Sequence, residues 1–358
     1  MKILVSLVSE QTIPNILLIK SLSGIDRYLF ISTQLMKDSG RREWICAVCN
    51  ICDYDEILVK EHSYADIIMH LNALVTYYPS DTIYVVNITG GTKIMALATC
   101  DHFRKAKAQI LYIPPQQTHA QLIHPSAIEE FVPLTYSLDA LEYLKAYGIS
   151  VEPISPITNH TSFLDKVFGF IAQSPNRGLA QIINNLGNKY ADCAGTKEVV
   201  HHFASLLNIH PDQVLEPAWL QFIKGKWFEE YLTYWISQCL PEARIYTNIK
   251  ISKDNVQNEL DLTFAYANTL YVIEAKTAVK LPAVKDYLYK LDSLRRDFGL
   301  FPRCFLSIAD SNNEADWLRA KIFQQRSQKM KIPVLSFSDL TPSTIQNTIM
   351  ERVIIQTT

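Results

Sequence analysis

Apolar and polar positions alternate along the first half of the chain in a way that predicts strands and helices in turn. Short apolar runs predict strands, and segments with apolar residues three or four positions apart predict helices. The predicted strands are Lys2–Leu7, Glu43–Val48, Thr82–Ile88 and Gln109–Ile113, and the predicted helices are Asn15–Leu22, Asp26–Asp38, Ile57–Tyr77 and Thr92–Lys105. This alternation predicts a doubly wound α/β sheet with right-handed crossovers.

The last third of the chain predicts a second α/β unit with a different order of elements. An amphipathic helix runs from Ile223 towards Cys239 and is stopped by Pro241, because proline cannot continue a helix. The connection Ala267-Asn268-Thr269 predicts a tight hairpin between two strand-like runs. The predicted strands are Arg244–Ile251, Glu259–Tyr266, Leu270–Lys276 and Arg303–Ile308, with a helix at Val284–Arg296 before the last strand.

A change in composition near residue 150 predicts the boundary between these two units. The segment Gly148–Pro156 contains Pro153 and Pro156 and is typical of a linker. Residues 161–209 show helical character without strong strand signals. We therefore predict a Rossmann-like α/β domain over residues 1–147, a linker and helical connector over 148–215, and a second α/β domain over 216–358.

Composition is that of an ordinary globular protein. Of the 358 residues 48% are hydrophobic and 20% are charged, no apolar run is long enough to span a bilayer, and the N-terminus lacks a signal-peptide profile. We therefore expect a cytoplasmic protein without a membrane segment. The seven cysteines are scattered, which argues against a disulfide framework. Cys46, Cys49 and Cys52 have the spacing of a metal site but no fourth ligand nearby, so we interpret them as thiols of a buried strand and its exit.

Net charge gives no general indication of nucleic-acid binding. The whole chain carries a formal charge of −2. Residues 216–358 contain 18 Lys and Arg against 16 Asp and Glu, which leaves −4 for the rest of the chain. A surface that binds nucleic acid must therefore be a local patch.

Three ionisable residues of the C-terminal unit form a candidate catalytic site. Asp261 lies in one predicted strand, alternation places Glu274 and Lys276 on one face of the next, and the hairpin brings them together. Paired carboxylates suit Mg²⁺ or Mn²⁺, which assists phosphodiester hydrolysis, and a lysine stabilises the charge that develops on the phosphate. The alternative is that Glu274 and Lys276 face solvent and Asp261 forms an ordinary ion pair.

An acid on the preceding helix would complete this site. The segment Gly225–Leu232 contains two adjacent candidates, Glu229 and Glu230. No histidine occurs after His210, which excludes histidine-based nuclease chemistry in the C-terminal unit. Together these residues favour metal-assisted hydrolysis.

Two polar loops form a candidate ligand site in the N-terminal domain. Thr89-Gly90-Gly91-Thr92-Lys93 follows a buried strand and opens a helix, where glycines permit close approach of the backbone and the helix N-terminus suits phosphate. The segment lacks the P-loop pattern, so ATP hydrolysis is unsupported. The loop Val8–Asn15 lies at the same carboxyl edge of the predicted sheet, where such folds bind ligands. The alternative is a Gly-Gly turn that only connects strand and helix.

The segments GKWFEEYL, NELD and IEAKT resemble the PD-(D/E)XK nuclease superfamily, with Asn-Glu-Leu-Asp in place of the proline–aspartate element. The resemblance implies a restriction-endonuclease-like fold in which Lys276 is the catalytic lysine, and Glu230 is the rival of Glu229 as helical acid. The segment Tyr289–Arg296 resembles the basic helix of this fold, which implies that Lys290 contacts phosphate; the alternative is a solvated helix face. The metal ligands that the resemblance implies are Asp261, Glu274 and Glu229.

The two units together resemble the CARF–nuclease effectors of type III CRISPR antiviral defence, over nearly the whole chain. The loop Thr89–Lys93 and the NELD and EAKT segments are the most specific marks. The resemblance implies a homodimer that binds a cyclic oligoadenylate, expected to be the tetra-adenylate, across its two-fold axis. Known members cut single-stranded DNA and RNA, or nick duplexes, with Mn²⁺ or Mg²⁺. The residues that it implies in ligand binding are Ser9, Gln11, Thr12, Ile13, Thr89, Gly90, Gly91, Thr92 and Lys93.

The hypothesis is therefore a metal-dependent endonuclease that its cyclic ligand activates allosterically. Two alternatives stay open. In the first, the chain is a ligand-responsive transcription regulator whose segment 161–209 binds DNA, although that segment lacks a clear basic recognition helix. In the second, the N-terminal domain degrades its own ligand with Ser9, Thr12 and Lys93. The sequence leaves open the ring size, the preferred metal and the choice between DNA and RNA.

Overall fold

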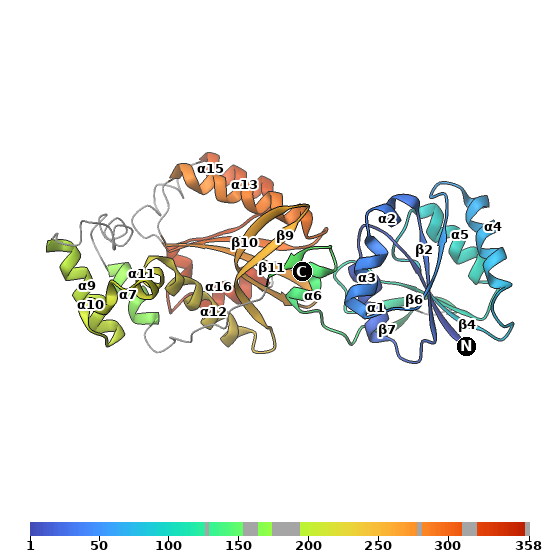
Figure 1. Cartoon of the computed structure of the whole chain (residues 1–358), viewed down its shortest axis with the longest axis horizontal. Coiled ribbons are helices and arrows are strands. Elements are labelled where there is room, and N and C mark those ends of the chain that lie inside the picture. Colours follow the sequence, from blue (N-terminus) through green and yellow to red (C-terminus); the bar gives the residue numbers. More distant parts are fainter. Residues whose placement is uncertain (126–128, 153–163, 174–193, 278–280, 310–320, 355–358) are drawn as a thin grey trace.

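The computed structural model describes residues 1–125, 129–152, 164–173, 194–277, 281–309 and 321–354. Within these ranges the chain forms two α/β halves that lie end to end, with helix α6 (Ala140–Lys145) and strand β8 (Ser150–Val151) at their junction (Figure 1). The N-terminal half is built on a seven-stranded sheet and the C-terminal half on a six-stranded sheet. No helix in the described part of the chain is long and apolar enough to cross a membrane.

The N-terminal sheet has the order β3-β2-β1-β4-β5-β6-β7, and its first five strands are parallel. The strands are β1 (Lys2–Leu7), β2 (Arg27–Ser32), β3 (Asp55–Leu58), β4 (Ile83–Asn87), β5 (Ala108–Tyr112), β6 (His119–His124) and β7 (Glu130–Pro133). The helices are α1 (Ile13–Ser21), α2 (Gln34–Asp38), α3 (Arg41–Cys49), α4 (Tyr64–Val75) and α5 (Lys93–Phe103). Helices α1 and α3 cover one face and α4 and α5 the other, which confirms the predicted doubly wound sheet (Figure 1).

Two elements predicted in this half are wrong in type. Asp26–Asp38, predicted as a helix, contains β2 and only the short helix α2, whereas Glu43–Val48, predicted as a strand, lies within α3. A short buried apolar run fits either type, because periodicity does not separate a buried strand from a buried helix. Aromatic and β-branched residues are frequent in Tyr28–Ile31, which favours the strand that forms there.

The long helix predicted at Ile57–Tyr77 is also shorter than expected. Its first residues form β3, and α4 begins only at Tyr64. Ser63 fixes this start, because its side chain accepts a hydrogen bond from the Asp66 amide at 3.2 Å. The helix therefore begins at its capping residue rather than at the first apolar position.

The C-terminal sheet has the order β13-β12-β11-β10-β9-β8, and its elements agree with the prediction for this half. Residues Tyr266 and Thr269 pair across the predicted hairpin, and Ala267 and Asn268 between them have φ of 47° and 58°, as a type I′ turn requires. The strands after β8 are β9 (Ile245–Lys253), β10 (Val256–Tyr266), β11 (Thr269–Lys276), β12 (Arg303–Ile308) and β13 (Val334–Leu335).

Helices cover both faces of this sheet. On one side lie α13 (Leu281–Asp297) and α15 (Lys321–Met330), and on the other α12 (Trp227–Cys239) and α16 (Ile345–Thr348) (Figure 1). Of the segment 161–209, the described residues 164–173 and 194–207 are helical as predicted, and 161–163 and 174–193 lie outside the described residues. The other helical segments are α7 (Leu164–Gln173), α9 (Ala194–Leu207), α10 (Pro211–Val214), α11 (Pro217–Gln221), a π-helix at Phe222–Lys226, a 3₁₀ helix at Phe337–Leu340 and a π-helix at Ile349–Ile354.

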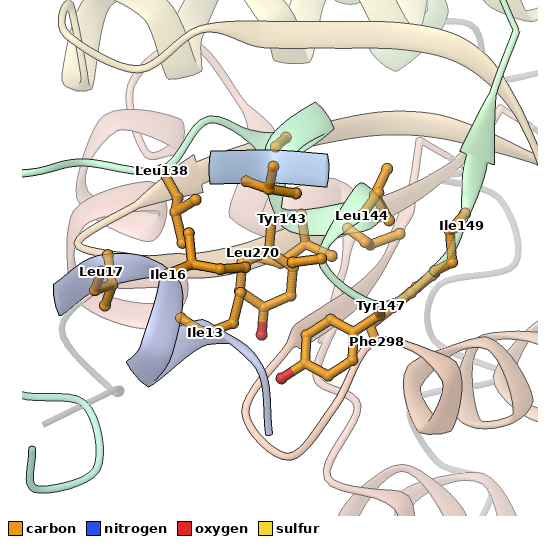
Figure 2. Close-up of a cluster of buried hydrophobic side chains, with 14 of the residues drawn as sticks. Ile13, Ile16, Leu17, Leu138, Tyr143, Leu144, Tyr147, Ile149, Leu270 and Phe298 are labelled. Carbon is orange, nitrogen blue, oxygen red and sulfur yellow. The ribbon is translucent and has the colours of Figure 1, made fainter. Parts of the chain in front are cut away.

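A buried apolar cluster joins the two halves (Figure 2). Leu270, at the start of β11, and Phe298, directly after α13, have no exposed surface. Burial of side chains of this size stabilises the contact by about 1.5–3 kcal/mol each. Gly299 has φ of +91°, and a Cβ atom there would lie 2.3 Å from the Tyr147 ring, so this packing requires glycine. The N-terminal half contributes Ile13, Ile16, Leu17, Leu138, Tyr143, Leu144, Tyr147 and Ile149.

Candidate active site and ligand cavity

The hairpin of β10 and β11 brings Asp261, Glu274 and Lys276 into direct contact. The Lys276 ammonium lies 2.7 Å from Asp261 Oδ2 and 2.9 Å from Glu274 Oε1. Asp261 Oδ2 also accepts a hydrogen bond from the Ala275 amide at 2.8 Å. Glu274 is 2% exposed and Asp261 is 8% exposed, so neither is a solvent-facing strand residue. Charged side chains are buried at a high cost in free energy unless they are paired, and Lys276 supplies that partner.

A second lysine reaches the same site from α13. Lys290 Nζ lies 2.8 Å from Glu274 Oε2 and 3.0 Å from Oε1, and it donates to the Glu259 carbonyl at 3.3 Å. Lys290 is therefore an ion-pair partner of the site rather than a residue of a solvated helix face. Two ammonium groups, those of Lys276 and Lys290, thus face the two carboxylates.

The charge of Lys276 is fixed by its neighbours. Burial lowers the pKa of this amine, but the attraction of Asp261 and Glu274 outweighs burial and holds the pKa above its ordinary value. Lys276 therefore stays a cation throughout the neutral pH range.

The two candidate helical acids point to different places. Glu230 is 6% exposed and therefore buried in the protein interior. Glu229 lies beside the site, where its Oε2 accepts a hydrogen bond from Asn248 Nδ2 at 2.5 Å. Burial raises the pKa of Glu229 to about 7, against the lowering effect of Asn248, and the negative charges of Asp261 and Glu259 add to the rise. The structure thus brings Glu229, and not Glu230, to the cluster.

The donor atoms fit a hard divalent cation. Within the described residues no group of three or more His, Cys, Asp and Glu side chains is arranged to hold a metal ion. Asp261 and Glu274 nevertheless direct carboxylate oxygens at one point, where the Lys276 ammonium lies. Mg²⁺ is commonly bound by one or two carboxylates, with water and substrate phosphate completing its shell. Carboxylates suit Mn²⁺ equally.

The cysteine motif lies far from this site, on α3 and its exit. Cys46 is buried, Cys49 is half-buried and Cys52 is exposed, so the interpretation as buried thiols fits the first best. Burial raises the pKa of Cys46 to about 11 and of Cys49 to about 12, which keeps these thiols protonated.

A cavity of about 560 Å³ lies at the carboxyl ends of β1 and β4, where the strand order changes direction. Two of the nine residues implied in ligand binding do not line it. Thr12 is buried and its hydroxyl donates to the Ala146 carbonyl at 2.6 Å, while Lys93 is exposed at the start of α5. Of the three residues considered for degradation of the ligand, only Ser9 lines the cavity. The residues that do line the cavity are Ser9, Gln11, Ile13, Thr89, Gly90, Gly91 and Thr92.

A buried amide network holds the two cavity loops. Asn87 Nδ2 donates to Asn15 Oδ1 at 2.7 Å, and Asn15 Nδ2 donates to the Leu7 carbonyl at 3.0 Å. Thr89 donates to Asn87 Oδ1 at 2.6 Å through its hydroxyl. A Cβ atom at Gly90 would lie 2.4 Å from the Leu7 carbonyl oxygen, so only glycine permits this approach. The Gly-Gly segment therefore does more than connect a strand to a helix.

The C-terminal half supplies one wall of the cavity, which the sequence did not predict. Gln11 Oε1 accepts hydrogen bonds from the Tyr147 hydroxyl at 2.9 Å and from the Leu300 amide at 3.3 Å. Asn268 Oδ1 accepts from the Leu138 amide at 2.9 Å. The turn propensity of Asn268 is visible in the sequence, but its partner is not. The wall consists of Ala267, Asn268, Thr269, Leu300 and Phe301.

Replacing Glu229 by glutamine should change the pH dependence of stability. Its pKa of about 7, against an ordinary 4.5, means that the folded protein binds this proton more tightly than the unfolded chain. That contribution to stability is present below pH 4.5 and is lost as the pH rises through 7. Urea denaturation of metal-free protein should therefore show a smaller fall in unfolding free energy over this window in Glu229→Gln. Glu242→Gln, which changes an exposed acid, is the control, and identical profiles for wild type and Glu229→Gln would contradict the shift.

Two family models match separate parts of the chain. Residues 3–143 match the Card1 CARF domain, and residues 218–338 match the Card1-like endonuclease domain. A comparison with curated proteins found no match. The first model covers the half with the ligand cavity, and the second covers the candidate catalytic residues.

Solved structures share this arrangement of two halves. Can2 from Sulfobacillus thermosulfidooxidans, in complex with cyclic tetra-adenylate, is 23% identical with a TM-score of 0.77, over 98% of this chain and 99% of that chain. VC1899 from Vibrio cholerae is 17% identical with a TM-score of 0.71, over 98% and 97%. A type III CRISPR defence DNA nuclease activated by cyclic oligoadenylate is 15% identical with a TM-score of 0.52, over 86% and 45%. These likenesses show the fold. The two domain matches show that the chain joins a Card1 CARF domain to a Card1-like endonuclease domain.

Proposed function

We propose that this protein is a metal-dependent endonuclease that a cyclic oligoadenylate activates in type III CRISPR antiviral defence. One observation carries the proposal: the hairpin that presents Asp261, Glu274 and Lys276 also forms, through its turn, a wall of the CARF cavity. A ligand in that cavity would touch the element that holds the catalytic residues. The cyclic tetra-adenylate bound to Can2 supports the same ligand here.

The charged residues divide the hydrolysis of a phosphodiester among them. Mg²⁺ or Mn²⁺ held by Asp261 and Glu274 would polarise the scissile phosphate and lower the pKa of a water. Lys276, a fixed cation, stabilises the negative charge that grows on the phosphate oxygens. Glu229, on the helix beside these two carboxylates, is the third acid that would help to hold the ion. Lys290, which pairs with Glu274, would bind a substrate phosphate beside that carboxylate.

Two structural connections between the cavity and the proposed catalytic site could transmit ligand binding to the nuclease domain. Thr269 lines the cavity, and Glu274 lies five residues further along β11, roughly 17 Å away at the usual rise of a strand. A second path starts at Gln11, whose bond to the Leu300 amide joins the ligand loop to the segment after α13. The ligand acts as an allosteric activator if it binds more tightly to the arrangement in which the nuclease cleft is open.

The homodimer is proposed on the CARF face away from the nuclease domain. Met69 of α4 and Leu97 of α5 are large apolar side chains that are each 58% exposed there, and a second subunit on this face would cover them. Met95 of the same α5 lines the cavity, so a two-fold axis beside this face would place equivalent loops around one ring. Sedimentation equilibrium should return twice the chain mass of 40.9 kDa. Leu97→Glu should return the mass of one chain. If the wild type at micromolar concentration also has the mass of one chain, the dimer is contradicted.

Loss of the catalytic lysine or glutamate should abolish cleavage without affecting ligand binding. Lys276→Ala removes the charge that stabilises the transition state, and Glu274→Ala removes a metal ligand, so each should lower the cleavage rate at least ~100-fold. Cleavage of single-stranded DNA, RNA and plasmid is measured separately in the presence of Mn²⁺, with and without cyclic tetra-adenylate or hexa-adenylate. Calorimetry measures ligand binding by the same variants. Lys329→Ala, on the surface of α15, is the matched control.

Two outcomes of this assay would contradict the proposal. Cleavage that survives both substitutions would show that the site lies elsewhere, and cleavage that survives chelation of the metal by EDTA would exclude metal dependence. Stable, metal-independent retention of duplex DNA without cleavage would favour a transcription regulator instead.

Removing the amide bridge at the hairpin turn should uncouple ligand binding from cleavage. Asn268 holds the turn to the CARF domain through the Leu138 amide, and its φ of 58° is one that glycine adopts freely. Asn268→Gly should keep the turn and ligand affinity within about threefold, while ligand-stimulated cleavage falls about tenfold. Cleavage rates against ligand concentration and direct ligand titration separate the two effects. Unchanged stimulation in Asn268→Gly would show that the signal does not pass through this turn.

A further inference from the structure

One residue in the strand beside the nuclease site has left-handed backbone geometry. Asn248 has φ of 52° within β9, whereas its neighbours Thr247 and Ile249 pair regularly with Leu262 and Leu260 of β10. Asn248 therefore stands opposite Asp261, between two regular pairs. Few side chains tolerate this geometry, asparagine among them, and it persists only where the surrounding structure maintains it.

The left-handed residue changes the direction of the side chains around it. In a regular strand, residues three positions apart point to opposite faces. Tyr246 and Ile249 are three apart, yet both are buried in the cluster that joins the two domains. The alternation of the strand is therefore shifted at Asn248, and its exposed side chain turns to α12 instead of following the pleat.

The partner on α12 is Glu229. Asn248 Nδ2 donates to Glu229 Oε2 at 2.5 Å, which is a short contact between an amide and a carboxylate. Glu229 has its own rotatable side chain at the start of α12, and this bond restricts it. The left-handed backbone at Asn248, opposite Asp261 in the sheet, thus directs the Asn248 amide towards the Glu229 carboxylate.

We propose that Asn248 is a positioning residue of the nuclease site, whose amide holds the Glu229 carboxylate in the orientation required for binding of a divalent cation. This inference rests on the proposed metal-dependent function. Residues that orient metal ligands by hydrogen bonds typically change metal affinity 10–100-fold when they are replaced, without touching the ion.

The test is calorimetric titration of the full-length protein with MnCl₂, which does not depend on cleavage. Asn248→Gly removes the amide and keeps a residue that adopts left-handed geometry freely, so the urea midpoint should not change. Its Mn²⁺ affinity should fall about tenfold. In a Glu229→Gln background the same change should have no further effect, because the two residues act as a pair. Asn255→Gly is the matched control, since Asn255 also has left-handed geometry, with φ of 63°, in the turn that follows β9.

Each other outcome has a definite meaning. Equal Mn²⁺ affinity in wild type and Asn248→Gly, or losses that add in the double variant, would overturn the inference. A rise in KM for nucleic acid with unchanged Mn²⁺ affinity would assign Asn248 to substrate contact instead, and a large fall in the urea midpoint would assign it a structural role. If the wild type does not bind Mn²⁺, the proposed metal-dependent function itself is contradicted. This result is distinct from failure of the Asn248 inference, because it is measured on the wild type alone.

Discussion

The contact on which the rest of the structure depends is the buried packing of the β10–β11 hairpin and the end of α13 against the CARF domain. Leu270 and Phe298 have no exposed surface in this cluster, and Gly299 lets the Tyr147 ring lie against the chain (Figure 2). Interiors of proteins are close-packed and barely compressible, so a shift of α1 or α6 must be taken up by the elements packed on them. Asp261 and Glu274 lie further along the hairpin, and Lys290 lies two turns before the end of α13. The elements that anchor the domains are therefore those that carry most of the charges of the nuclease site.

The hairpin that brings Asp261, Glu274 and Lys276 together could be predicted from sequence because local signals agreed there. Alternation placed Glu274 and Lys276 on one face, and the Ala267-Asn268 turn fixed the register that brings Asp261 to them. In the N-terminal half, the apolar residues around Glu43–Val48 and Tyr28–Ile31 are not accompanied by a turn or an alternation that distinguishes a strand from a helix. A fully buried helix and a fully buried strand both appear as unbroken apolar runs, so the two types were interchanged. The predicted fold class survived this error, because alternation of the remaining elements already predicts the doubly wound sheet.

The parts that could not be predicted depend on tertiary contacts. Glu229 and Glu230 are adjacent, and about 100° of helix rotation separates them, so only the placement of α12 decides which one reaches the site. Thr12 belongs to the predicted ligand loop, yet its hydroxyl faces inward to the Ala146 carbonyl. The wall that Asn268 contributes to the CARF cavity joins positions more than a hundred residues apart in the chain, as in its bond to Leu138. No local pattern encodes such a pairing, and a resemblance to separate domain families does not supply it either.

The charge balance of the nuclease site suggests why control by the CARF domain is possible at all. Asp261 and Glu274 are nearly buried, and Lys276 and Lys290 neutralise them in the present arrangement. A divalent cation bound by these carboxylates would compete with the ammonium groups for the same oxygens, so the position of the lysines would influence how tightly the proposed ion is held. Lys276 is fixed to the hairpin, but Lys290 belongs to α13, whose end packs on Tyr147 beside the ligand loop. A small displacement of α13 would therefore alter the pairing of Glu274 without breaking the hairpin. Ligand binding would then not have to assemble the site, because a change in the pairing of Glu274 with Lys276 and Lys290 would be sufficient.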